Sequence, residues 1–189
     1  MRDPAGTPEA ARERYLRFLQ PPLSCIAESE WVEGPPPRSA PGALAVTTRD
    51  APVRISRKRG LSGLALTATQ VFEVVEDDRF DSEWKVRTRA YAYVVSIVTR
   101  REPEPVEVFA WHWHPVRTPE RAYPHLHVRS EHRLLGLALK SLHLPTGRAS
   151  FEEVVRFMIE ELRAKPIQND WADVVRETEA RFRQYRTWA

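Results

Sequence analysis

The sequence predicts an α+β fold, with an antiparallel β-sheet, C-terminal helices packed on one face of it and a proline-rich N-terminal arm. Three observations support this. From about residue 43, segments rich in Val, Tyr, Phe, Trp and Thr follow one another through short connections, which favours antiparallel strands. Apolar residues at helical spacing come after these segments. Strands followed by helices indicate a sheet with helices against one face.

The arm is expected over residues 1–42, ahead of a single α+β domain over residues 43–189. Nine of the 16 prolines fall within the first 52 residues. A short helix is predicted from Pro8 to Leu19, and Pro21 should stop it because proline lacks an N–H and clashes with the preceding turn. Residues 20–42 are expected to form an extended connector.

Five segments of the domain have the composition and alternation of strands. They are Ala43–Thr48, Leu64–Val75, Trp84–Thr99, Glu107–Trp113 and His125–Arg129.

Three helices are expected after the strands. The first covers Glu131–Ser141, which is rich in Leu. The second begins at the capping box Ser150–Glu153, carries an apolar stripe and ends before Pro166. Asp170 is expected to cap the last helix.

The composition indicates a cytoplasmic protein without membrane contact. The single cysteine, Cys25, excludes an intramolecular disulfide and a cysteine-based zinc finger. The N-terminus lacks the apolar core of a secretory signal, and no apolar stretch is long enough to span a bilayer. The net charge is only +3, with 25 Arg and 4 Lys. Codon usage in a GC-rich genome explains this excess of arginine, and recognition of phosphate groups by arginine is the alternative.

All six histidines lie between His112 and His143. On alternating strands, His112 and His114 share one face, and His125 and His127 share a face with Arg129. Pairing the two strands so that their apolar sides coincide sets His114 opposite His125 and His112 opposite His127. We therefore expect four imidazoles on one patch of the sheet. The apolar floor beneath them would consist of Phe109, Trp111, Trp113, Leu126 and Val128.

The neighbouring strand, Trp84–Thr99, extends this patch. Arg87, Arg89, Tyr91 and Tyr93 fall on one parity of the strand, together with Lys85. A basic and aromatic face beside histidines suits an anionic ligand with stackable rings, such as RNA. The alternative is an ordinary solvated strand face with cross-strand packing of the tyrosines.

Three interpretations of the histidines remain open. Imidazoles titrate near neutrality, so His112, His114, His125 and His127 could cleave RNA by acid–base catalysis without a metal or other cofactor. The same four side chains could instead bind zinc or another transition metal. Alternatively, they are exposed residues without chemistry. His132 and His143 receive no role beyond packing.

The order of elements resembles the TumE-type toxins of bacterial toxin–antitoxin modules. The resemblance covers roughly residues 64–163: the Tyr91/Tyr93 strand, a strand with a polar end, the His125/His127 strand and an amphipathic helix. The family tends to have Tyr-Asp-Asn where this chain has Trp-His-Trp-His, so only His125 and His127 are carried over as functional positions. The resemblance implies a cytoplasmic toxin with a cognate antitoxin as its partner.

The sequence thus predicts a toxin-like or ribonuclease-like protein that acts on RNA through a histidine-rich sheet face. The first alternative is a metal-binding protein or enzyme. The second is a non-enzymatic module that binds a protein partner through Trp111, Trp113 and the arm. Whether the protein is an enzyme, and its oligomeric state, are left open by these patterns.

Overall fold

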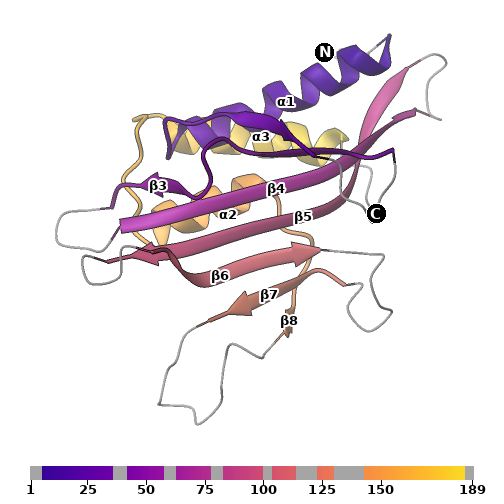
Figure 1. Ribbon diagram of the computed structural model, residues 1–189. Helices are drawn as coiled ribbons and strands as arrows, with labels where there is room; N and C mark the ends of the chain where they lie inside the picture. Colours follow the sequence, from indigo (N-terminus) through magenta and orange to yellow (C-terminus); the bar gives the residue numbers. More distant parts are fainter. Residues whose placement is uncertain are drawn as a thin grey trace.

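The fold is α+β, as the order of the predicted elements indicates (Figure 1). The computed structural model describes residues 6–35, 42–57, 63–77, 83–99, 104–113, 123–129 and 143–185. Within these ranges, eight strands form one antiparallel sheet in the order β1-β2-β4-β5-β6-β7-β8, and β3 pairs with β4 beside β2. The strands are β1 (Trp31–Gly34), β2 (Leu44–Thr48), β3 (Val53–Ile55), β4 (Gly63–Glu76), β5 (Trp84–Val98), β6 (Val106–Trp113), β7 (His125–Val128) and β8 (His143–Pro145). The helices are α1 (Pro8–Ser24), α2 (Phe151–Glu160) and α3 (Trp171–Tyr185).

The five predicted strands are all present, with ends within one or two residues of their expected positions. The sequence did not indicate β1, β3 and β8, because three or four residues are too few for an alternation pattern. β1 lies within the segment expected to be an extended connector, and it pairs with β2 from Trp31↔Thr48 to Gly34↔Ala45.

The first helix is longer than predicted. α1 continues through Pro21 and Pro22 to Ser24, so the expectation that Pro21 stops it is wrong. An interior proline costs about 3 kcal/mol. Packing offsets this cost, because Leu19 and Leu23 are buried and each such side chain contributes about 1.5–3 kcal/mol. The indole of Trp31 in β1 also donates to the carbonyl of Leu19 at 3.0 Å, which ties the end of the helix to the sheet.

The capping box of α2 is confirmed. The amide of Glu153 donates to the Ser150 hydroxyl at 3.1 Å, and the amide of Ser150 donates to the Glu153 carboxylate at 2.8 Å. α2 ends at Glu160, before Pro166, as predicted. The amide of Val174 in α3 donates to the carbonyl of Asp170 at 3.1 Å. The helix predicted over Glu131–Ser141 lies outside the described residues.

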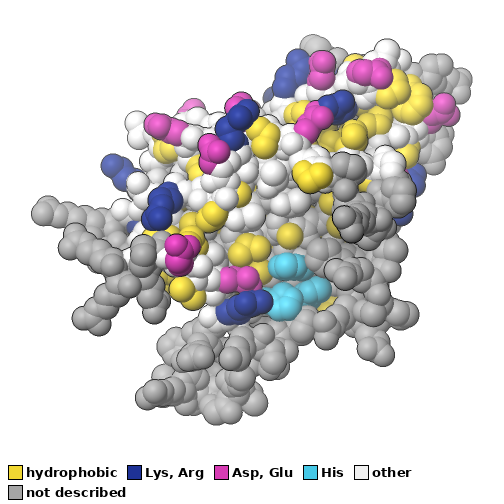
Figure 2. All heavy atoms as spheres, in the orientation of Figure 1, with side chains coloured by type: hydrophobic (Ala, Val, Ile, Leu, Met, Phe, Trp, Pro, Cys, Tyr) yellow, Lys and Arg dark blue, Asp and Glu magenta, His cyan; other side chains and the backbone are white. Residues whose placement is uncertain are grey.

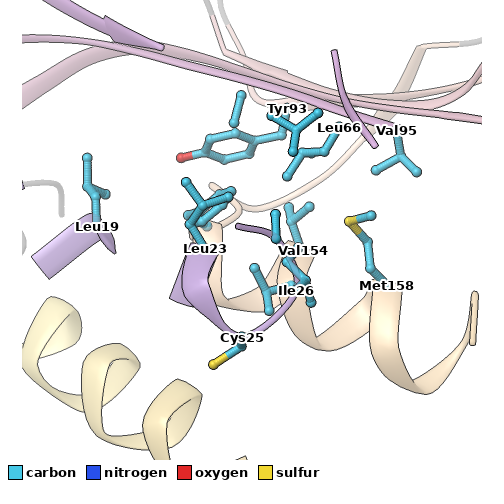
Figure 3. Close-up of a cluster of buried hydrophobic side chains, with 14 of the residues drawn as sticks. Leu19, Leu23, Cys25, Ile26, Leu66, Tyr93, Val95, Val154 and Met158 are labelled. Atoms are coloured by element: carbon cyan, nitrogen blue, oxygen red, sulfur yellow. The ribbon is translucent and has the colours of Figure 1, made fainter. Parts of the chain in front are cut away.

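The core lies between the helices and one face of the sheet, and Figure 3 shows its central part. Side chains of β4 and β5 point toward the helices, and those of α1, the residues after it and α2 meet them. This group includes Leu19, Leu23, Ile26, Leu66, Tyr93, Val95, Val154 and Met158. The helices in Figure 1 lie on this side of the sheet. We call the other side the open face, because no described helix covers it.

None of the helices in the described part of the chain has the length and apolar character needed to cross a bilayer.

Candidate functional site

The pairing of β6 with β7 brings the histidines together on the open face. Trp111 pairs with Leu126, and His112 pairs with His125. The predicted register, in which His112 lies opposite His127, is therefore wrong by two residues, since His127 pairs with Ala110. A shift of two residues keeps every side chain on its face, so His112, His125 and His127 still share one side of the sheet. The fourth predicted member, His114, lies outside the described residues.

Aromatic packing determines which side the histidines occupy. On the helix-covered face, Phe109 and Trp111 pack edge-on against Phe157 of α2, with ring centroids 5.2 and 5.4 Å apart. Trp113 is buried, and the guanidinium of Arg148 lies 3.6 Å above its ring. Because alternate residues of a strand point to opposite faces, His112 between Trp111 and Trp113 must point to the open face.

The histidine cluster, which we define as His112, His125 and His127, is compact. Its ring centroids are 4.9 Å apart for His125–His127, 5.1 Å for His112–His127 and 5.9 Å for His112–His125. His125 is buried at 5% exposure, whereas the other two imidazoles are half-buried. Figure 2 shows the histidines gathered on the viewed face, with basic and acidic side chains beside them.

A backbone hydrogen bond orients His125. Its Nδ1 lies 2.9 Å from the carbonyl oxygen of Tyr123. A carbonyl can only accept, so Nδ1 carries the proton, and in the neutral ring Nε2 carries the lone pair. The ring is thus held in one tautomer and one orientation by the chain just before β7.

Arg129 lies on the same row as His125 and His127, directly after β7. Its Nε is 3.0 Å from a carboxylate oxygen of Glu107, and its side chain is 54% exposed. The amide of Arg129 donates to the carbonyl of Val108 at 2.9 Å, which holds the end of β7 against β6. A partly exposed guanidinium is therefore positioned beside the histidine cluster.

The structure separates the residues predicted to bind RNA on β5. Val71 pairs with Ala90 and Phe72 pairs with Thr88, so Arg89 is the extra residue of a β-bulge. The alternation changes side at this point. Tyr91 and Tyr93 consequently face the helices at 2% exposure each, and the prediction that they share a face with Arg87 and Arg89 is wrong.

The two tyrosines are core residues. Their rings stack with centroids 4.9 Å apart, and the Tyr91 hydroxyl accepts a hydrogen bond from the amide of Ala149 at 2.9 Å. Burial raises the pKa of Tyr91 to about 12 and raises the pKa of Tyr93 well above its usual value. A bound base could not reach either ring without displacing the helices.

Arg87 and Arg89 remain on the open face. Both guanidiniums lie near one carboxylate oxygen of Glu73, at 3.2 and 3.5 Å. Two cations share a single carboxylate, so the group keeps one net positive charge. Both side chains are more than 40% exposed, as a contact with an anionic ligand requires.

The sequence reasoning missed Tyr123. Its ring centroid lies 5.8 Å from that of His125 at an interplanar angle of 72°, and the side chain is 40% exposed. Strand alternation contains the signal, because Tyr123 precedes His125 by two residues and falls on the same parity as His127 and Arg129.

The predicted metal ligands can be compared with the structure only in part, because His114 is outside the described ranges. Within those ranges, no group of three or more His, Cys, Asp or Glu side chains is arranged to hold a metal ion.

Comparisons with models of protein families, with curated proteins and with solved structures find no match to this chain. The resemblance to TumE-type toxins therefore stays a prediction from the sequence.

Proposed function

We propose that the protein cleaves RNA at the histidine cluster by acid–base catalysis. The observation that carries the proposal is the convergence of three imidazoles from two neighbouring strands within 4.9–5.9 Å on the open face. A guanidinium, that of Arg129, follows on the same row of β7. Imidazole is the side chain best suited to give and accept protons near neutral pH, and a guanidinium binds phosphate through its planar fork.

His112 and His127 form the acid–base pair in this proposal. Both are half-buried, so a substrate can reach them, and their rings are 5.1 Å apart. Two imidazolium charges at that distance repel each other. This repulsion favours a state in which one ring is protonated and the other is neutral, as a pair of one acid and one base requires.

The reaction needs no co-reactant. The neutral imidazole takes the proton of the 2′-hydroxyl, and the 2′-oxygen forms a bond to the adjacent phosphorus. The bond from phosphorus to the 5′-oxygen breaks, and the imidazolium gives its proton to that leaving oxygen. The products are a 2′,3′-cyclic phosphate and a 5′-hydroxyl. The attacking oxygen is the 2′-hydroxyl of the substrate itself. Because DNA has no 2′-hydroxyl, it is not cleaved.

The remaining residues have supporting roles. Arg129 would stabilise the negative charge that builds on the phosphoryl oxygens, with Glu107 orienting its guanidinium. His125 is a positioning residue: it is buried, its Nδ1–H donates to the Tyr123 carbonyl, and its ring contacts both other imidazoles.

A cleavage assay in EDTA tests the proposal. Wild-type protein and the His112→Ala/His127→Ala double variant are incubated with a labelled single-stranded RNA, and the ends of the products are identified. Wild type should leave cyclic phosphates, and the double variant should be slower by a factor on the order of 10² to 10⁴. Arg176→Ala, which removes an exposed arginine of α3, is the control and should cleave like wild type.

Equal cleavage by wild type and the double variant would refute the proposal. So would an absence of cleavage by wild type on RNAs of varied sequence, or products that carry a 5′-phosphate.

The toxin-like role is the second part of the proposal and rests on the sequence resemblance. If the protein is a toxin, its expression in a bacterial host should arrest growth, and expression of the double variant should not. Equally slow growth with both proteins would mean that the toxicity does not depend on His112 and His127. That result would contradict the toxin-like role.

A further inference from the structure

One row of side chains runs along β7 and its flanks on the open face: Tyr123, His125, His127 and Arg129. Successive members are two residues apart, and a strand rises about 3.3–3.4 Å per residue, so His125 and His127 are about 7 Å apart along β7, with Tyr123 and Arg129 just beyond its two ends. It has an aromatic ring at one end, a guanidinium at the other and the imidazoles between them. The two ends of the row therefore differ chemically.

Tyr123 differs from the buried tyrosines of β5 in its exposure. At 40% exposure it is the most exposed aromatic side chain among those that the structure describes. Its place is nevertheless defined, because its own carbonyl accepts the His125 Nδ1–H and its ring packs edge-on against that imidazole. An exposed ring in a fixed position beside the site can stack on a planar ligand.

We infer that Tyr123 is the base-stacking residue of the site, and that its substrate is unpaired RNA bound along β7. The inference rests on the proposed RNA-cleaving function. The base next to the cleaved phosphate stacks on Tyr123, and the cleaved phosphate lies over the imidazoles, within reach of the Arg129 guanidinium. A base in a duplex has neighbours on both faces, so it cannot present a face to the tyrosine ring. A base in a single strand can.

The experiment measures binding of an RNA of about eight nucleotides with 2′-O-methyl groups, which cannot be cleaved by attack of the 2′-oxygen. Fluorescence anisotropy gives Kd for the single strand and for the same strand annealed to its complement. The variants are Tyr123→Ala, Tyr123→Leu and Tyr123→Phe. Tyr123→Ala retains the carbonyl that holds His125, because that acceptor is in the backbone. Ile167→Ala, at another exposed apolar residue, is the control.

Stacking of one base on an aromatic ring predicts about a tenfold rise in Kd for Tyr123→Ala and Tyr123→Leu. Tyr123→Phe and Ile167→Ala should stay close to wild type, and the duplex should bind more weakly than the single strand. On cleavable RNA, loss of the ring should raise KM about as much and leave kcat nearly unchanged. A merely structural role would lower kcat and the melting temperature instead.

The outcomes separate this inference from the proposed function. Cleavage by wild type with equal binding by Tyr123→Ala, or with equal binding of duplex and single strand, overturns the inference and leaves the ribonuclease proposal standing. Binding that depends on the ring, without any cleavage, supports the inference and refutes the ribonuclease. No binding of RNA by wild type overturns both.

Discussion

Glu152 is a carboxyl group buried at the start of α2, and Glu152→Gln tests how much a buried charge costs this fold. The side chain is 4% exposed. Desolvation raises its pKa from the ordinary 4.5 to about 7, and the nearby Glu179 and Glu153 act in the same direction. Hydrogen bonds from its own backbone amide and from Ser150 oppose the rise but are weaker.

The groups that face Glu152 come from every element packed around it. They are Tyr15 of α1, Tyr93 of β5, the N-cap Ser150 of α2, Glu153 in the first turn of α2, and Glu179 of α3. Glu179 itself pairs with Arg156 and Arg183. No cation is among the causes of the Glu152 shift. The charges that shift the pKa of Glu152 are those of Glu179 and Glu153, and both disfavour its ionised form.

The raised pKa determines the sign of the pH dependence. Between about pH 4.5 and pH 7, the folded protein holds a proton on Glu152 that the unfolded chain has released. The free energy of unfolding therefore falls as the pH rises through this window and stays low above it. At about 1.4 kcal/mol per pH unit, the full cost is on the order of 3 kcal/mol. That is a large share of the 5–15 kcal/mol typical of a domain.

Glutamine has nearly the same shape and stays neutral, so Glu152→Gln removes this cost. We expect the variant to be close to wild type near pH 5 and more stable than wild type by up to about 3 kcal/mol at pH 8. Urea denaturation followed by circular dichroism between pH 5 and pH 8 measures the difference. Glu160→Gln, at an exposed carboxylate of the same helix, is the matched control.

The difference between variant and wild type is the quantity that matters, because other titrating groups contribute equally to both proteins. A constant difference from pH 5 to pH 8 would refute the reasoning. A variant that becomes less stable than wild type as the pH rises would refute it as well.

Three further predictions concern the site and its supports. Arg129→Ala should lower kcat/KM for RNA cleavage by roughly 10- to 100-fold. Arg129→Lys should recover only part of this activity, because lysine keeps the charge but loses the planar fork. Initial rates of RNA cleavage measure the effect, and full activity of Arg129→Ala would contradict its role. Tyr91→Phe should lower the free energy of unfolding by about 1 kcal/mol, because the Ala149 amide loses its acceptor. RNA binding by this variant should be unchanged, and weaker binding would place Tyr91 at the site after all. Ser150→Ala should destabilise the fold by about 1 kcal/mol in urea denaturation, because it opens the capping box; no loss would mean that packing alone starts α2.

The candidate site shows what strand alternation can and cannot predict. The alternation of aromatic and histidine residues in β6 and β7 is enough to predict that His112, His125 and His127 share a face. It cannot choose between registers that differ by two residues, because each buries the same apolar side chains. His112 therefore pairs with His125 instead of the predicted His127.

A single bulge changed the predicted RNA-binding face. Alternation assumes an unbroken ladder, and the extra residue at Arg89 reverses it for the rest of β5. Nothing local to Arg87 or Arg89 distinguishes a bulge from a regular strand. The decision depends on the partner strand, β4, and on the space beneath the helices that Tyr91 and Tyr93 fill.

The sequence by itself determined the class of fold, the extents of the long strands, the start of α2 and the side of the sheet that the histidines occupy. These features depend on short-range periodicity and capping, which a chain carries in its local order of residues. The tertiary structure alone decided the strand register, the bulge at Arg89 and the passage of α1 through Pro21. Each of these depends on contacts between segments far apart in the chain, where packing outweighs local preference.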